Sequence, residues 1–130
     1  MNKRVLILDN DKDVLDILQE VFTSSGFDVK AIDESVNVFE EVNTYKPDVV
    51  LLDYILNGIN GGEICHQLKT NKATSNMPVV IVSAHNRVIQ SLGNYGSDAF
   101  IAKPFDIDDL VQQVNSLLVA ESDMNSTIHH

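Results

Sequence analysis

The sequence is short of positive charge, of cysteine and of long hydrophobic runs, and each shortage excludes a class of protein. It has 9 Lys and Arg residues against 19 Asp and Glu, a formal net charge of −10, which argues against unaided binding to nucleic acid or to an anionic membrane surface. The single cysteine, Cys65, cannot form an internal disulfide, as is typical of proteins in a reducing cytoplasm. No apolar run approaches the roughly 18 residues that span a membrane. We therefore expect a cytoplasmic protein whose charge suits a cation or a basic partner surface.

The hydrophobic residues that are present fall into short runs separated by segments of helical periodicity. With 130 residues, 44% of them hydrophobic, the chain is long enough for one domain with its own core. The predicted strands cover residues 5–8, 27–32, 49–52, 79–82 and 100–102, and the helical patterns cover residues 14–22, 38–42, 63–70, 86–95 and 110–118. The side chains expected to cap the first, second and last helices are Asp11 or Asn10, Ser35 and Asp106.

This alternation of strands and helices predicts one α/β domain. Each parallel crossover needs a helix, so the pattern predicts a parallel sheet with helices on both faces. Residues 1–120 are expected to form the domain. Residues 121–130 are expected to form a flexible C-terminal tail, and the two histidines that close it resemble the remnant of an expression tag.

Four of the five predicted strands end on side chains with usable chemistry. These strand-end residues are Asp9-Asn10-Asp11, Asp53, Ser83 and Lys103. The carboxyl ends of parallel strands lie at one edge of the sheet, so we expect the groups to lie together. Carboxylates and an amide suit Mg²⁺, Lys and Ser suit phosphoryl oxygens, and an Asp carboxylate can be the nucleophile of phosphoryl transfer, giving an acyl phosphate. Each residue alone is more often structural, but capping does not explain all of them at successive strand ends.

With these motifs, the sequence resembles the response-regulator receiver domains over residues 3–119. The motifs that carry the resemblance are the acidic cluster after the first strand, Leu51-Leu52-Asp53 with Gly61 eight residues later, Ser83-Ala84 and Lys103-Pro104-Phe105. The resemblance implies a flavodoxin-like (βα)5 fold with a parallel five-stranded sheet in the order 2-1-3-4-5. It also implies that Asp53 accepts a phosphoryl group from a histidine kinase or a histidine phosphotransfer protein.

The resemblance assigns roles to the other residues near the strand ends. Mg²⁺ would be held by Asp9, Asn10, Asp53 and the backbone carbonyl of Ile55. The phosphoryl group would be bound by Ser83 and Lys103. Phe100 matches the family's switch aromatic, and Ile55 and His85 match two positions that tune the lifetime of the phosphoryl group. The peptide bond before the matched Pro104 is often cis in the family.

The implied protein is a signalling switch, not an enzyme that acts on other molecules, because it catalyses only its own phosphorylation and dephosphorylation. Phosphorylation would change a face formed by the fourth helix, the fifth strand and the fifth helix, which would dock a downstream effector protein. The domain alone would bind neither nucleic acid nor a membrane. The sequence leaves open the kinase, the effector and whether the phosphorylated domain dimerises through that face.

Three positions depart from the family pattern. Asn10 falls where the second of two adjacent acids is expected, and an Asn carbonyl can ligate Mg²⁺ but brings no charge. Asp11 is expected to point elsewhere, so we predict weaker Mg²⁺ binding than with Asp at position 10. Asn57 stands where a Pro is usual, which leaves a looser loop. Phe100 stands where Tyr is commoner, so this position offers no hydroxyl.

Two other families match parts of the acidic cluster. Positions 1, 3, 5 and 12 of a calcium-binding EF-hand loop are matched by Asp9, Asp11, Asp13 and Glu20. Val14 nevertheless stands where that loop needs Gly, and a strand precedes it, so we reject this interpretation. The opening of the cluster also resembles haloacid-dehalogenase-type phosphatases, but such an enzyme would leave Asp53 without a role.

The phosphatase stays a remote alternative, and the main alternative is a pseudo-receiver, folded in the same way but acting as an unphosphorylated interaction module. Asn10 supports it, whereas Asp53, Ser83 and Lys103 oppose it. At the tuning position, His85 has two interpretations: it either orients a water that attacks the phosphoryl group or is simply an exposed residue at the start of a helix.

Overall fold

The structure is a computed structural model that describes residues 2–32, 37–53, 55–56, 59–84 and 96–128. The predicted helix over residues 86–95, the tuning residue His85 and the substituted loop position Asn57 lie outside these ranges. Within them, the five predicted strands and the four predicted helices that they include follow one another in the predicted order, with two short strands at residues 55–56 and 59–60 that the pattern did not predict.

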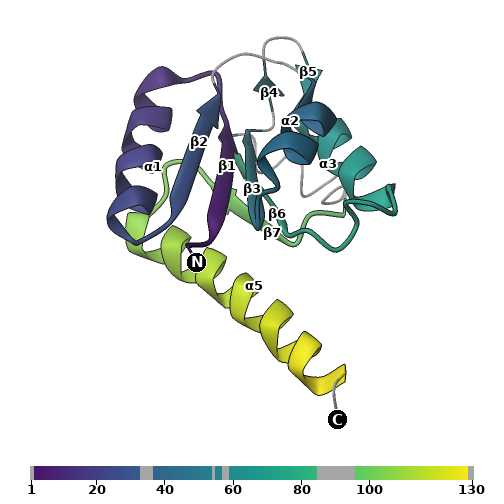
Figure 1. The fold of residues 1–130 in the computed structure, drawn as a ribbon. Coiled ribbons are helices and arrows are strands. Elements are labelled where there is room, and N and C mark those ends of the chain that lie inside the picture. The colour runs from purple at the N-terminus through teal and green to yellow at the C-terminus, as the bar shows by residue number, and fades with distance from the viewer. Residues whose placement is uncertain (1, 33–36, 54, 57–58, 85–95, 129–130) are drawn as a thin grey trace.

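One parallel sheet of five strands lies at the centre of the domain (Figure 1). Its strands are β1 (Arg4–Leu8), β2 (Asp28–Ile32), β3 (Val49–Asp53), β6 (Val79–Ser83) and β7 (Ala99–Ala102). They lie in the order β2-β1-β3-β6-β7. Counted among the sheet strands alone, this order is 2-1-3-4-5, which confirms the predicted α/β fold. A separate antiparallel pair is formed by β4 (Ile55–Leu56) and β5 (Ile59–Asn60).

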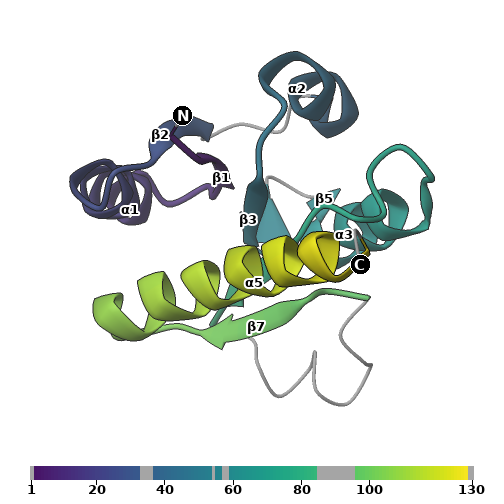
Figure 2. The same cartoon turned by 60° about the horizontal axis from the view of Figure 1, so that its bottom comes forward.

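Helices cover both faces of the sheet, and each face has its own core (Figures 1 and 2). On one face lie α1 (Lys12–Ser24) and α5 (Ile107–Ile128), and on the other lie α2 (Val38–Tyr45) and α3 (Gly61–Thr70). Successive side chains of a strand point to opposite faces, so Val5 and Ile7 belong to the first core while Leu6 and Leu8 belong to the second. A strand covered on both faces must be apolar throughout, which explains the unbroken runs in β1, β3 and β6.

Three of the described helices begin on side-chain caps, and α5 begins on the predicted one, because the Asp106 carboxylate accepts a hydrogen bond from the Asp109 N–H at 3.1 Å. The Asp11 carboxylate accepts hydrogen bonds from the backbone N–H groups of Asp13 and Val14 at 3.0 and 3.4 Å, so Asp11 and not Asn10 caps α1. Helix α2 is capped by Asn37 and not by the predicted Ser35, because the Asn37 side chain accepts a hydrogen bond from the Glu40 N–H at 3.1 Å. Asn and Ser cap equally well, so the pattern could not choose between them.

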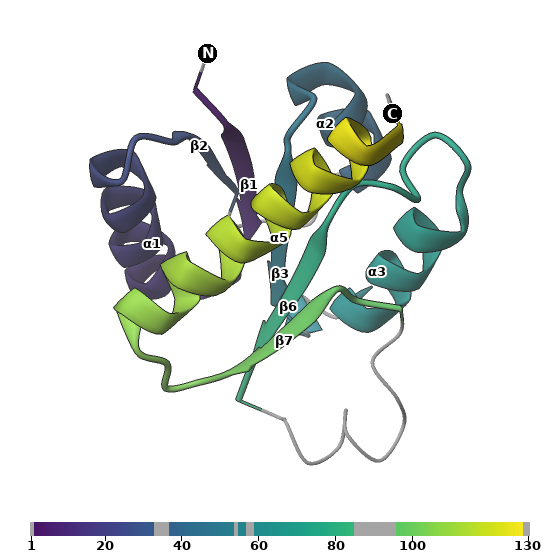
Figure 3. The ribbon, with the colours of Figure 1, turned by 90° about the horizontal axis from the view of Figure 1, so that it is seen from below.

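The last helix is longer than predicted. The apolar pattern ends at Leu118, whereas α5 continues to Ile128 through most of the segment expected to form a tail. Residues 119–128 contain neither Gly nor Pro, so no residue interrupts the helical backbone. The first turns of α5 lie beside α1 (Figure 3), and its last turns extend away from the sheet (Figure 1). Among the described helices, none combines the length and the apolar character needed to cross a membrane.

Candidate functional site

Four of the predicted site residues come together at the carboxyl edge of the sheet. Strands β1, β3, β6 and β7 are neighbours and run parallel, so they end at the same edge. Asp53 is the last residue of β3 and Ser83 the last of β6, while Asp9 and Lys103 directly follow β1 and β7. In Figure 1 the arrowheads of β1 and β2 point to this edge. The topology of the sheet therefore gathers residues that lie far apart in the sequence.

A lysine lies between two carboxylates at this edge. The Lys103 amine is 2.8 Å from a carboxylate oxygen of Asp9 and 3.6 Å from one of Asp53. The side chains of Asp9, Asp53 and Lys103 are 3%, 11% and 18% exposed. Charges this far out of water need a partner, and their attraction is less screened than at the surface. The three side chains thus form one electrostatic unit.

The acidic cluster after β1 is divided between two tasks. One oxygen of Asp9 accepts a hydrogen bond from the Asp11 N–H at 2.8 Å, and the other oxygen meets Lys103. The Asp11 carboxylate caps α1 through one of its oxygens. Asn10 is exposed. Of the three residues in this cluster, Asp9 is the one whose carboxylate meets Lys103.

The ends of β6 and β7 are joined by their backbones. The backbone carbonyl of Ser83 accepts a hydrogen bond from the Lys103 N–H at 2.8 Å, which fixes Lys103 relative to β6. Ser83 is fully buried. The peptide bond between Lys103 and Pro104 is cis, in agreement with the resemblance.

The donor chemistry at this edge fits Mg²⁺. In the parts of the chain that the structure describes, no three His, Cys, Asp or Glu side chains gather as a metal site. The edge offers the two carboxylates of Asp9 and Asp53, next to the amide of Asn10. Mg²⁺ commonly takes one or two protein carboxylates and keeps several waters, so this set is sufficient, though less negative than a set of three acids. The ligand assignment, including the Ile55 carbonyl, stays a prediction.

The remaining predicted residues lie beside this edge. Phe100, in β7, is partly buried and packs against the core under α2 and α3. Ile55 lies in β4, where it pairs with Asn60 of β5.

An apolar hollow lined in part by Lys103 was not predicted from the sequence. It has a volume of about 410 Å³ and is lined by Val14, Ile17, Ala84, Lys103, Pro104, Phe105 and Ile107. Ile17 and Ile107 are 47% and 41% exposed, which is unusual for large hydrophobic side chains. Ile17 was detectable, because it falls off the buried stripe of α1 at Leu15 and Leu18 and so had to face outward.

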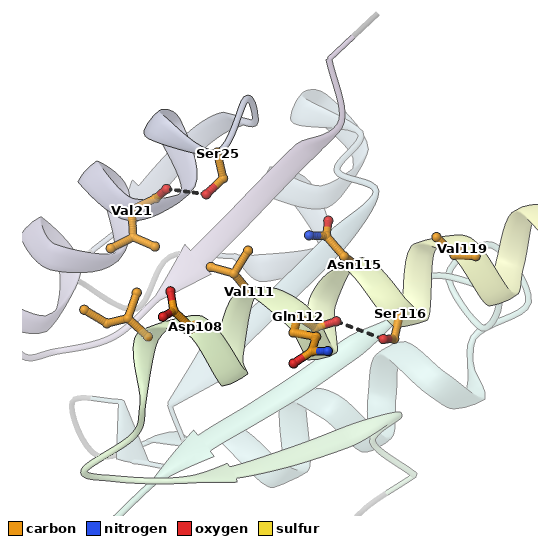
Figure 4. A pocket seen from close by; sticks show the side chains of 9 residues that line it. Val21, Ser25, Asp108, Val111, Gln112, Asn115, Ser116 and Val119 are labelled. Carbon is orange, nitrogen blue, oxygen red and sulfur yellow. Dashed lines mark hydrogen bonds between the residues drawn. The ribbon is translucent and has the colours of Figure 1, made fainter.

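A second hollow, of about 710 Å³, lies between α1 and α5 (Figure 4). Val21 of α1 faces Val111 of α5 across it, and Val119, Ser25 and polar side chains of α5 complete its wall. It shares Ile107 with the first hollow and is lined by none of the strand-end residues. The larger of these two hollows is therefore separate from the site at the carboxyl edge.

The fold and the site define a class: a parallel α/β domain that presents two carboxylates and a lysine at the carboxyl edge of its sheet. The sequence pattern of the response regulator receiver domain matches residues 5–115. The chain therefore belongs to the response regulator receiver domain family.

Individual relatives agree with this assignment. The chain is 34% identical over 125 residues to the DNA-binding response regulator MtrA of Mycolicibacterium paratuberculosis, covering 95% of this chain and 54% of MtrA. The receiver domain of a Francisella response regulator is 30% identical, with a TM-score of 0.78 over 92% of this chain and 98% of that one. The response regulator TrrA of Thermotoga maritima, solved in complex with Mg²⁺-BeF, is 22% identical, with a TM-score of 0.79 over 88% and 98%, and shows the fold alone. The chain spans about half the length of the curated relative it matches.

Proposed function

We propose that the domain accepts a phosphoryl group on Asp53 from the phosphohistidine of a histidine kinase or a histidine phosphotransfer protein. The observation that carries this proposal is the position of the Lys103 amine, 2.8 Å from Asp9 and 3.6 Å from Asp53 at the carboxyl edge of the sheet. A nucleophilic carboxylate beside a held positive charge is the arrangement that phosphoryl transfer requires, because catalysis there is mostly positioning and charge neutralisation.

In the transfer, a carboxylate oxygen of Asp53 forms a bond to phosphorus while the bond from phosphorus to the imidazole nitrogen of the donor breaks. The electron pair of that bond returns to the imidazole. Lys103 offsets the charge of the phosphoryl oxygens, and the Ser83 hydroxyl donates a hydrogen bond to one of them. Mg²⁺, held by Asp9, Asn10, Asp53 and the Ile55 carbonyl, would add further positive charge.

The domain acts as a switch because this modification is reversible. Water removes the phosphoryl group from Asp53, at a rate tuned by Ile55 and His85, and the domain acts on no other substrate. Phe100 transmits the state of the site to the face that includes β7 and α5, where an effector protein docks.

The apolar hollow beside Lys103 is the surface we assign to the phosphodonor. Its exposed Ile17 and Ile107 line the same hollow as Lys103, so a protein seated there brings its histidine to the carboxyl edge. Two exposed acids lie in the segments that carry these isoleucines: Asp13 is in α1, as is Ile17, and Asp106 directly precedes Ile107. A donor that presents apolar side chains flanked by Lys or Arg would match this surface in shape and charge.

Intact mass after incubation with acetyl phosphate tests the phosphoacceptor. With Mg²⁺, we expect a single adduct on the wild type, which disappears with EDTA and in Asp53→Asn. Asp28→Asn, which makes the same change at an exposed carboxylate on the opposite edge, should leave the adduct in place. An adduct that persists in Asp53→Asn would contradict the proposal.

The pseudo-receiver is favoured by one observation, the neutral and exposed Asn10 in place of a metal-binding acid. It predicts no adduct on a folded wild-type protein at any Mg²⁺ concentration. The same mass measurement, run beside a circular dichroism spectrum that establishes folding, therefore separates the two functions.

A further inference from the structure

Lys103 lies closer to a predicted metal ligand than to the predicted phosphoacceptor. Its amine is 2.8 Å from the Asp9 carboxylate and 3.6 Å from that of Asp53. Both oxygens of Asp9 are engaged, one by the Asp11 N–H and the other by Lys103. The Asp9 oxygen that a cation would use without disturbing α1 is therefore the one that Lys103 holds.

The local charge explains why this contact forms. Asp11 serves as the cap of α1, and Asn10 is neutral, so Asp9 and Asp53 are the carboxylates that face the Lys103 amine. One positive charge against two negative charges leaves a net charge of −1 for these three side chains. A divalent cation brings the two charges that would balance the carboxylates, and it makes the lysine dispensable there.

We infer that Lys103 is the built-in competitor of Mg²⁺: it neutralises Asp9 in the metal-free domain and leaves Asp9 when the metal binds. Its release frees the amine for the phosphoryl oxygens at Asp53, so metal binding prepares the phosphoryl site. This inference rests on the proposed function for the identity of the metal and of the phosphoacceptor. It goes beyond the proposed function, because it assigns Lys103 a place beside Asp9 in the metal-free domain and a role as the competitor of the metal.

The test is a titration of the full chain with Mg²⁺ alone, followed by the backbone amide shifts in NMR spectra. Lys103→Met keeps the length of the side chain and removes its charge. It leaves the buried Asp9 charge without its partner, which a cation then relieves, so we expect Mg²⁺ to bind about tenfold more tightly. Lys69→Met is the matched control, because the Lys69 amine also lies 2.8 Å from an Asp and its side chain is similarly buried; its Mg²⁺ affinity should stay within about twofold of the wild type. An affinity of Lys103→Met that equals or falls below that of the wild type overturns the inference.

A second measurement needs no variant and so does not depend on the folding of Lys103→Met. The wild type is acetylated briefly with an amine-reactive ester in EDTA or in saturating Mg²⁺, and the peptides are quantified by mass. We expect Mg²⁺ to raise the labelling of Lys103 severalfold relative to that of Lys69. A ratio that Mg²⁺ leaves unchanged, or lowers, contradicts the release of Lys103.

These measurements fail independently of the proposed function. Neither contains a phosphodonor, so a domain that binds Mg²⁺ in competition with Lys103 but forms no acyl phosphate would uphold the inference and refute the function. A domain that is phosphorylated on Asp53 while Lys103→Met leaves Mg²⁺ affinity unchanged would do the reverse.

Discussion

Two regions of the molecule hold a lysine and an aspartate in ion pairs of the same length. At the carboxyl edge of the sheet, the Lys103 amine lies 2.8 Å from Asp9, and at the end of α3 the Lys69 amine lies 2.8 Å from Asp98. The lysine side chains are 18% and 16% exposed. The Asp9 side chain is 3% exposed and that of Asp98 is 32% exposed, so the two pairs share a distance and a lysine burial but differ in the burial of the carboxylate and in their neighbours.

The neighbours of Lys69 are backbone groups. Its amine also donates to the Met77 carbonyl at 3.1 Å, and the Asp98 carboxylate accepts from the Val79 N–H at 2.9 Å. The Asp98 N–H in turn donates to the Val79 carbonyl at 2.8 Å. The pair thus ties α3 to the start of β6 and to the residue before β7. Its charges are matched one to one, so it stabilises the fold and has no use for another ion.

The neighbour of the Lys103 pair is a second carboxylate, Asp53, at 3.6 Å. This neighbour leaves the region with more negative than positive charge, an arrangement that costs stability and favours the binding of a cation. The comparison of the two ion pairs therefore teaches that the surplus charge around a pair, and not the length of the pair, identifies a functional site.

The largest expected difference between the regions is in phosphorylation. Lys103→Met removes the charge beside Asp53, so we expect the rate of Asp53 phosphorylation by acetyl phosphate to fall about 100-fold. Lys69→Met removes an equally buried lysine at a distance and should leave the rate of the folded protein within about twofold. The rates are measured by intact mass against time. Equal losses in the two variants would mean that both lysines act through folding.

The free energy of unfolding should depend more on the Lys69–Asp98 pair than on the Lys103–Asp9 pair, the reverse of the order expected for phosphorylation. Asp98→Ala deletes the acceptor of the buried Val79 N–H and the partner of Lys69, so we expect it to lower the free energy of unfolding by about 2 kcal/mol. Asp9→Asn keeps the oxygen that accepts from Asp11 and leaves Lys103 with Asp53, so its cost should stay below about 1 kcal/mol. Urea denaturation followed by circular dichroism measures both. A larger loss in Asp9→Asn than in Asp98→Ala would reverse the comparison.

The contrast between the two pairs also marks the limit of what sequence can predict. Unbroken apolar runs predicted β1, β3 and β6, and the polar residues at the strand ends predicted that Asp9, Asp53, Ser83 and Lys103 would converge. The runs follow from burial on both faces of the sheet, and the convergence follows from the common direction of parallel strands, so neither needs side-chain coordinates. The order of the strands came from the resemblance and not from the periodicity.

The periodicity of the sequence could not predict contacts between side chains of different elements. Lys69 and Asp98 are 29 residues apart, and neither lies on an apolar stripe that would reveal its position. The choice of Lys103 between Asp9 and Asp53 depends on differences below 1 Å, which only the packed structure fixes. The end of α5 was missed because polar residues without Gly or Pro permit a helix as readily as a tail.

The pair at α3 can be probed further through Cys65, which lies on the same helix and is fully buried. Burial raises the pKa of its thiol to about 12, while Lys69 lowers it and Asp98 raises it by smaller amounts. An unfolded thiol titrates near pH 8.5, so above that pH the unfolded chain loses a proton that the folded chain keeps. Stability therefore falls as pH rises, by about 1.4 kcal/mol from this group at pH 9.5.

Cys65→Ala removes this ionisation and should flatten the fall in stability between pH 8 and 9.5, as measured by urea denaturation at each pH. The comparison is one of slopes, because the alanine also loses packing at every pH. Parallel pH profiles for the wild type and Cys65→Ala would show that the thiol does not contribute.

The smallest expected effect concerns Asn10, which follows Asp9 at the carboxyl edge of the sheet. Asn10→Asp adds a second charge to the metal-binding edge, but at an exposed position where solvent screens it, so we expect Mg²⁺ to bind about threefold more tightly. Asn115→Asp adds the same charge to an exposed position of α5 and should leave the affinity unchanged. Because the added acid increases the surplus of negative charge while Lys103 still holds Asp9, the gain should be smaller than that of Lys103→Met in the same NMR titration. Equal affinities for the wild type and Asn10→Asp would show that the missing acid does not limit metal binding.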